Sequence, residues 1–221
     1  MSAFTGFNPN QIEQLSRTVN TISNEVGNSI RIKLESGIVT PISQAWFTQE
    51  GVDYFNSFRD AVRNSENIIQ EIFNAFNQGL RKAGENWADQ VRSRQRVSVQ
   101  NVGRPNLNIN VSAVRPDRGG DIGIDENAAN AVANQVAGIR ADIQAELKSQ
   151  AQRLEANAAF MGHGQADAVR NCFTQINEEV ARIFRILDED GDGQSLRSAI
   201  KAAVTKYGQI GANTSSFFNA S

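Results

Sequence analysis

Apolar residues recur three or four residues apart along most of this chain, and this spacing constrains the fold more than any other feature. It places a narrow apolar stripe on one face of a helix, and that stripe has to be buried against another helix. In the first half, the stripe runs in two stretches separated by a break at residues 46–51. Each stretch would be about 55–65 Å long as a helix. Because a short turn joins them, we expect an antiparallel helical hairpin.

The hairpin has a recognisable start and several weak points. Asn8 followed by Pro9 is typical of a helix N-terminus, with Asn as the N-cap and Pro at the first helical position. Gly27, Gly37 and Pro41 should bend or loosen the first helix, since glycine and proline are poor helix formers.

The second half repeats this plan. One stripe runs from Val132 to Ala158, a glycine-rich break follows at residues 160–164, and a second stripe runs from Val169 to Leu187. An acidic interruption at residues 188–193 precedes a last apolar stretch that ends at Tyr207. Small and polar residues dominate from Gly208 onward, which predicts a loose tail.

The segment between the two halves has a different pattern. Apolar residues alternate with polar ones, which is typical of a half-exposed strand, and a turn signal at residues 103–105 would allow a short hairpin from Val97 to Val114. The same stretch is locally basic, so it is either a solvated linker or a docking site for an acidic partner. Its basic residues are Arg92, Arg94, Arg96, Arg104, Arg115 and Arg118.

These patterns predict an all-α fold of two long antiparallel helical hairpins that form an elongated four-helix bundle, with a short β-like linker. The expected boundaries are 8–95 for the first hairpin, 96–125 for the linker, 126–208 for the second hairpin and 209–221 for a flexible tail.

Composition excludes several classes of protein. The chain is 40% hydrophobic and 21% charged, with a formal net charge of −2, which argues against a nucleic-acid binder. No apolar run approaches the roughly 18 residues needed to span a bilayer. The first 16 residues lack the basic and apolar regions of a cleaved signal peptide. We therefore expect no membrane span and no nucleic-acid partner.

One local string suggests a metal ion. Asp188, Asp190 and Asp192, followed by Gly193, match the start of an EF-hand calcium loop. Position 12 of that loop would be Ala199 in place of the bidentate glutamate, so the string predicts at most a weak calcium site and otherwise an acidic loop that interrupts a helix.

The residues offer little for catalysis. Cys172 is the only cysteine and His163 the only histidine. His163 falls in the predicted turn, whereas Cys172 falls beside the apolar stripe of the next helix, where a small buried thiol is expected. We expect no catalytic residues, no enzyme activity and no cofactor other than the calcium considered above.

The long hairpin with an aromatic residue and a glycine at its turn resembles the WXG (ESAT-like) family of bacterial type VII secretion. Trp46 lies where the family's tryptophan would be, although Gly51 follows it by five residues instead of two. In the second half Phe160 and Gly162 have the family's spacing, with Phe in place of Trp. The family's export signal, Tyr-x-x-x-Asp/Glu, is not matched, because Gly211 stands four residues after Tyr207.

This resemblance implies a tandem WXG-like substrate, adaptor or targeting module that acts by docking a helix face to a protein partner or to itself. It would be secreted by a route that needs no signal peptide, or be cytoplasmic before export. The missing signal means either that it is not exported directly or that a partner chain carries the signal. The residues expected to pack and dock at the hairpin turns are Trp46, Gly51, Phe55, Phe58, Phe160 and Gly162.

Two other functions fit the same residues. Long hairpins with an open apolar face polymerise readily, so the chain could be a self-assembling filament or sheath subunit. A calcium-responsive helical module acting through the acidic loop is the third hypothesis.

Overall fold

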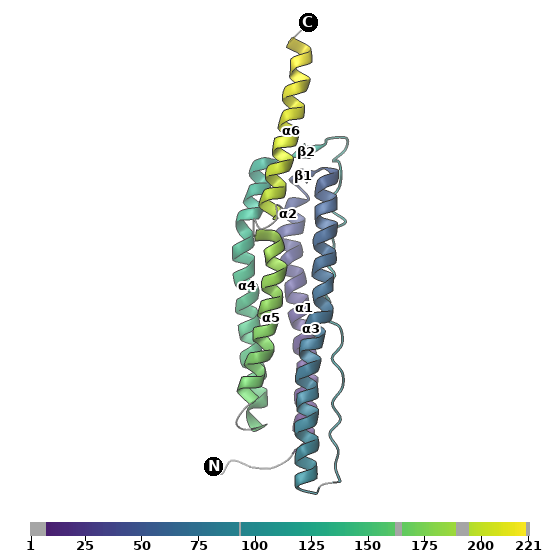
Figure 1. Ribbon diagram of the computed structural model, residues 1–221, viewed down its shortest axis with the longest axis vertical. Helices are drawn as coiled ribbons and strands as arrows, with labels where there is room; N and C mark the ends of the chain where they lie inside the picture. The colour runs from purple at the N-terminus through teal and green to yellow at the C-terminus, as the bar shows by residue number, and fades with distance from the viewer. Residues whose placement is uncertain (1–7, 93, 162–164, 189–194, 220–221) are drawn as a thin grey trace. The chain divides into compact units, whose positions relative to one another are not determined.

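The computed structural model describes residues 8–92, 94–161, 165–188 and 195–219. It is 78% helical, and its long helices pack against one another, which confirms the predicted all-α bundle. The long helices are α1 (Pro9–Leu34), α3 (Gln49–Gln90), α4 (Glu126–Ala158), α5 (Gln165–Asp188) and α6 (Leu196–Asn219) (Figure 1). The short elements are the π-helical turn η1 (Glu35–Val39), α2 (Thr40–Ile42), β1 (Trp46–Phe47), β2 (Gly123–Ile124) and the 3₁₀ turn η2 (Ala159–Met161).

Four of the long helices begin at a side chain that accepts a hydrogen bond from the first turn. The Asn8 carboxamide oxygen accepts from the backbone N–H of Asn10 at 3.1 Å, as the sequence predicted. Thr48, Asp125 and Ser195 do the same for α3, α4 and α6. Such caps satisfy amide groups that have no partner within the helix.

The chain divides into two compact units, and each unit combines segments from both halves of the sequence. The first unit comprises Met1–Ser29, Glu66–Asn106 and Gln144–Glu179, and the second comprises Ile30–Ser65, Leu107–Ile143 and Val180–Ser221. Because the divisions fall within α1, α3, α4 and α5, each of these helices contributes residues to both units.

The first unit is built from parts of α1, α3, α4 and α5 around an apolar core. The rings of Phe73 in α3 and Phe173 in α5 meet edge to face, with centroids 6.1 Å apart. At the surface, Arg153 of α4 pairs with Glu25 of α1 at 2.5 Å. Other core side chains of this unit are Leu15, Val19, Ile22, Val26, Ile69, Leu147, Leu154, Val169 and Ile176.

An extended segment, which we call the strap (residues 95–111), runs beside α3 (Figure 1). No strand is assigned within it, so the hairpin considered from Val97 to Val114 does not form. Most of its apolar side chains are buried, although Val99 is only half-buried, and most of its polar side chains point to solvent. The alternation of apolar and polar residues in this segment is therefore explained by packing on helices and not by pairing between strands.

Side chains of α1 and α3 take the place of a neighbouring strand in the first unit. The Asn74 carboxamide oxygen accepts from the backbone N–H of Val102 at 2.6 Å, and the Asn77 amide donates to the carbonyl of Gln100 at 3.0 Å. The Gln70 amide donates to the carbonyl of Val102 at 2.9 Å. These bonds satisfy backbone groups that would otherwise lose water without gaining a partner.

Within the second unit, the two short strands join the start of α3 to the start of α4. β1 and β2 are antiparallel, with Trp46 opposite Ile124, and the backbone N–H of Asp125 donates to the carbonyl of Ala45 at 2.7 Å. The predicted weak point at Gly37 lies in the π-helical turn, where a Cβ would come within 2.5 Å of the Ile139 side chain. The glycine thus allows α4 to approach the helix closely.

The last helix extends past its predicted end. The sequence suggested a loose tail from residue 209, but α6 continues to Asn219. Gly208 and Gly211 cost only about 1 kcal/mol each in a helix, and no proline follows them to stop it.

Candidate functional site

Trp46 organises the corner between α2 and α3. Its side chain is 1% exposed, and its indole N–H donates to the hydroxyl oxygen of Thr48 at 2.7 Å. The same oxygen accepts from the backbone N–H of Gly51 at 3.1 Å. One threonine thus caps α3 and holds the tryptophan ring in place.

The structure brings Trp46 and Gly51 together although five positions separate them. A Cβ on Gly51 would lie 3.1 Å from the indole ring, so the absence of a side chain lets the ring lie against the first turn of α3. Phe55 and Phe58 follow on the same helix, with ring centroids 6.3 Å apart in an edge-to-face arrangement. All four residues are buried, so in this structure they pack the corner and present no free surface to a partner.

The predicted site residues of the second half are described only in part. Phe160 lies in the 3₁₀ turn η2 and is partly exposed, whereas Gly162 and His163 lie outside the described residues. Asp188 is exposed at the end of α5, and Asp190 and Asp192 also lie outside the described residues. Among the residues that the structure describes, no group of three His, Cys, Asp or Glu side chains could hold a metal ion. The calcium site stays a prediction.

In the second unit, an ion pair and a hydrogen bond join α6 to the start of α3. The Lys206 ammonium forms an ion pair with the Glu50 carboxylate, and the Tyr207 hydroxyl donates to the same carboxylate at 3.1 Å. Chiefly through the hydrogen bond from Lys206, the pKa of Glu50 falls from 4.5 to about 2.

This contact predicts a dependence of stability on pH. Because folding lowers the pKa of Glu50, the contact stabilises the folded chain above about pH 4.5, and this contribution is lost as the pH falls towards about 2. We expect the Tm of the unmodified protein to fall more steeply over this range than that of Glu50→Gln. The matched control is Asp53→Asn, whose hydrogen-bond partner Gln49 lies in the same helix. Equal slopes for the unmodified protein and Glu50→Gln would contradict the prediction.

The basic residues of the linker are exposed in the structure. Arg96 pairs with Asp89 at 3.0 Å, and the guanidinium of Arg118 lies over the ring of Phe47 at 5.4 Å. A docking site for an acidic partner would have to compete with these contacts.

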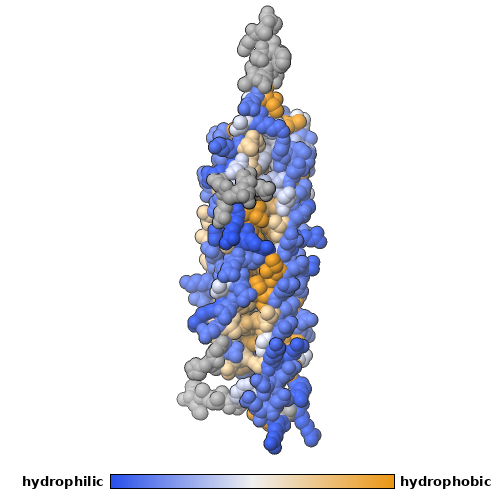
Figure 2. All heavy atoms as spheres, in the orientation of Figure 1, coloured by the Kyte–Doolittle hydropathy of each residue, from blue (hydrophilic) through white to orange (hydrophobic). Residues whose placement is uncertain are grey.

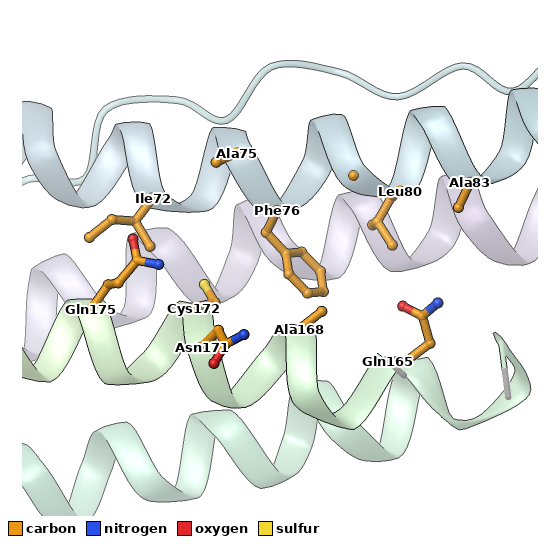
Figure 3. Close-up of a pocket in the computed structure, with 11 residues that line it drawn as sticks. Ile72, Ala75, Phe76, Leu80, Ala83, Gln165, Ala168, Asn171, Cys172 and Gln175 are labelled. Carbon is orange, nitrogen blue, oxygen red and sulfur yellow. The ribbon is translucent and has the colours of Figure 1, made fainter. Parts of the chain in front are cut away.

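The first unit carries a groove between α3 and α5, with a volume of about 400 Å³ (Figure 3). Phe76 and Leu80 of α3 point into it, toward Ala168 and Gln165 of α5 (Figure 3). On the face drawn in the space-filling view, apolar patches lie between mainly hydrophilic ridges (Figure 2). Its lining residues are Ile72, Ala75, Phe76, Gly79, Leu80, Ala83, Gln165, Ala168, Asn171, Cys172 and Gln175.

None of the residues that line the groove is charged, although 21% of the residues in the chain are charged. Ala75, Gly79 and Ala83 lie four residues apart on α3, and a Cβ added at Gly79 would meet nothing within 4 Å. Small side chains at this spacing leave room for another helix to approach closely.

Cys172 lies in the floor of the groove. The thiol is free and buried, as the sequence predicted, and burial raises its pKa to about 12. It is therefore protonated at neutral pH and a poor nucleophile, since the thiolate is the reactive form.

The sequence reasoning missed the groove, although its placement of Phe76 and Leu80 in the buried apolar stripe is confirmed. The signal that could have found it is the run of small residues four apart on α3 together with the uncharged face of α5 from Gln165 to Gln175. That α3 and α5 leave a space at these positions follows only from the packing.

Comparison with protein families, with curated proteins and with solved structures finds no match in any of the three. No described helix is both long enough and apolar enough to cross a membrane.

Proposed function

We propose that this protein is a non-enzymatic helical adaptor or substrate of type VII secretion that works by docking a helix into the groove between α3 and α5. The observation that supports a docking function is the groove itself, because it leaves a space between two helices that is lined by apolar, small and amide side chains and by no charged ones. Apolar grooves of this kind recognise one face of a partner helix. The assignment to type VII secretion rests on the resemblance of the helical hairpin and of its Trp46–Gly51 corner.

The secretion part of the proposal is tested in a bacterium that has a type VII system. The tagged full chain is produced in the parent strain and in a strain that lacks the system, and its amount is measured in the medium and in the cells. A chain that is a substrate, or that travels with one, appears in the medium of the parent strain only. Equal amounts in the two media would overturn the assignment to this pathway.

The docking part is tested with a charge placed in the groove. Ala75→Asp puts a carboxylate on the groove wall, whereas Gln78→Asp puts one on an exposed position of α3 that does not line it. If the groove binds a partner helix, Ala75→Asp should weaken that binding at least tenfold and Gln78→Asp should leave it within about twofold, because burying an unpaired charge is costly. Equal effects of the two variants would contradict docking in the groove.

The self-assembly hypothesis predicts a different mass in solution from the adaptor hypothesis. The open groove favours it as the second candidate, since an apolar surface that fits another part of the same molecule generates chains of copies. Light scattering over a concentration series distinguishes a filament, whose mass grows with concentration, from an adaptor of constant mass.

A further inference from the structure

The second unit has a pocket of its own beside the corner between α2 and α3, with a volume of about 290 Å³. One wall comes from the turn between the two helices, through Ser43, Gln44 and Phe47. The other wall comes from the end of the linker, between Ala113 and Gly119. Whereas the groove of the first unit has no charged lining residue, this pocket is lined by two arginines and one aspartate.

Two contacts hold Arg118 at the edge of this pocket. Its backbone N–H and carbonyl exchange hydrogen bonds with those of Asp121, at 2.9 and 3.2 Å, around a turn in which Gly119 and Gly120 have φ values of +63° and +100°. Two successive glycines at positive φ are typical of a tight type I′ turn. The Arg118 guanidinium lies over the ring of Phe47, 5.4 Å from its centre, and pairing of β1 with β2 fixes the position of that ring. The arginine is therefore positioned without a ligand.

The positive charge of the pocket is not neutralised within the part of the chain that the structure describes. Neither Arg115 nor Arg118 forms an ion pair with a described residue, and Asp117, which lies between them in the sequence, forms none either. Two arginines and one aspartate give the pocket a formal charge of +1. From residue 92 to residue 118, six arginines stand against one acidic residue, in a chain whose net charge is −2. Charge complementarity therefore favours an anionic ligand.

Size and charge favour a carboxylate among the possible anions. Pockets that enclose a drug-sized ligand start at about 300 Å³, so a volume of about 290 Å³ suits one or two side chains of a partner. A single carboxylate would neutralise the charge of +1, whereas a doubly charged phosphate would leave excess negative charge beside Asp117. Guanidinium groups bind carboxylates through two parallel hydrogen bonds. Phe47 and Ala113 add apolar lining for the aliphatic part of an acidic side chain.

We infer that this pocket binds a side-chain carboxylate of an acidic partner peptide through the guanidinium groups of Arg115 and Arg118. Phe47 can keep Arg118 in position while the carboxylate is bound, because a carboxylate takes only some of the N–H donors of a guanidinium. The inference goes beyond the proposed docking of a helix, since it concerns the other unit and a charged ligand. It assigns the acidic-partner site considered for the linker to two of its six arginines.

Fluorescence anisotropy tests the inference with a short peptide of alternating Glu and Ala residues. The peptide carries a neutral dye and is acetylated and amidated, so that all its carboxylates belong to side chains. We expect saturable binding to the unmodified chain, weakened at least about tenfold in Arg115→Gln and in Arg118→Gln, since each variant removes a charged hydrogen-bond donor. Arg104→Gln is the matched control, because this exposed arginine of the same linker does not line the pocket, and binding should stay within about twofold.

A third variant gives an effect of opposite sign. Asp117→Asn should tighten binding of the Glu peptide, because it removes a negative charge from the pocket that the carboxylate enters. A purely structural role of the pocket residues would not produce tighter binding. Circular dichroism checks that each variant is folded.

Equal weakening by all three arginine variants would show attraction to the linker as a whole and would overturn the inference. Absence of saturable binding, or equal binding of a peptide with Gln in place of Glu, would also overturn it. Inorganic phosphate that displaces the peptide at a lower concentration than acetate does would assign the pocket to phosphate in place of a carboxylate. Ala75→Asp, which tests the groove, should bind the Glu peptide like the unmodified chain, so the failure of one proposal is distinguishable from the failure of the other.

Discussion

Replacing Trp46 with alanine is expected to lower the free energy of unfolding by about 3–5 kcal/mol, as for other large buried aromatic residues. The side chain is 1% exposed, packs against Gly51, and donates to the threonine that caps α3. The loss therefore combines a cavity with a weakened helix start. Denaturant unfolding followed by circular dichroism measures it.

The second tryptophan provides a matched control. Trp87 is 41% exposed on α3, so Trp87→Ala should cost no more than about 1 kcal/mol. If the two variants are destabilised equally, Trp46 does not organise the corner as described. The two residues also differ in fluorescence, since only the indole of Trp46 is shielded from water.

Replacing Asn74 and Asn77 together with alanine is expected to destabilise the chain by about 3 kcal/mol and to release part of the strap. Each variant leaves a backbone group of the strap without its side-chain partner, at a cost of about 1–3 kcal/mol where the group is buried. Because these bonds hold an extended segment and not a helix, we expect limited proteolysis to cut the strap between residues 95 and 106 well before the helices.

Gln78→Ala tests whether this effect belongs to the hydrogen bonds. Gln78 lies on the same helix but is exposed, so its replacement should change stability by less than about 0.5 kcal/mol and leave proteolysis unchanged. Cleavage of the double variant in the helices first, or at the rate of the control, would show that the strap is held by its apolar side chains alone.

In the strap, the alternation of apolar and polar residues correctly indicated an extended chain, but the sequence reasoning paired that chain with another strand and not with helices. Alternation of apolar and polar residues at Val97, Val99, Leu107 and Ile109 means that the two sides of an extended chain meet different environments. It does not say whether the backbone bonds to another strand or to side chains. Here Asn74 and Asn77 serve in place of a strand.

The residues expected to dock at the first hairpin turn show the same limit of sequence reasoning. The sequence placed Trp46, Gly51, Phe55 and Phe58 at a corner, and the structure brings Trp46 and Gly51 into contact there. Their burial shows that they pack the corner, while the open space between helices lies elsewhere, in the groove. An aromatic residue in sequence does not reveal whether its ring faces a core or a partner.

By itself, the sequence determined the all-α class, the helix start at Asn8, the break at Trp46 and the buried state of Cys172, because these depend on local propensity and on the period of the apolar residues. Only the tertiary structure decided where helices meet and where they leave space. Gly79 and Gly84 look alike in the sequence, on one helix. A Cβ at Gly84 would lie 2.6 Å from the Val97 side chain, whereas one at Gly79 would meet nothing within 4 Å. A segment distant in the sequence packs against Gly84 but none packs against Gly79. The spacing of residues along one helix does not predict which of its positions a distant segment will cover.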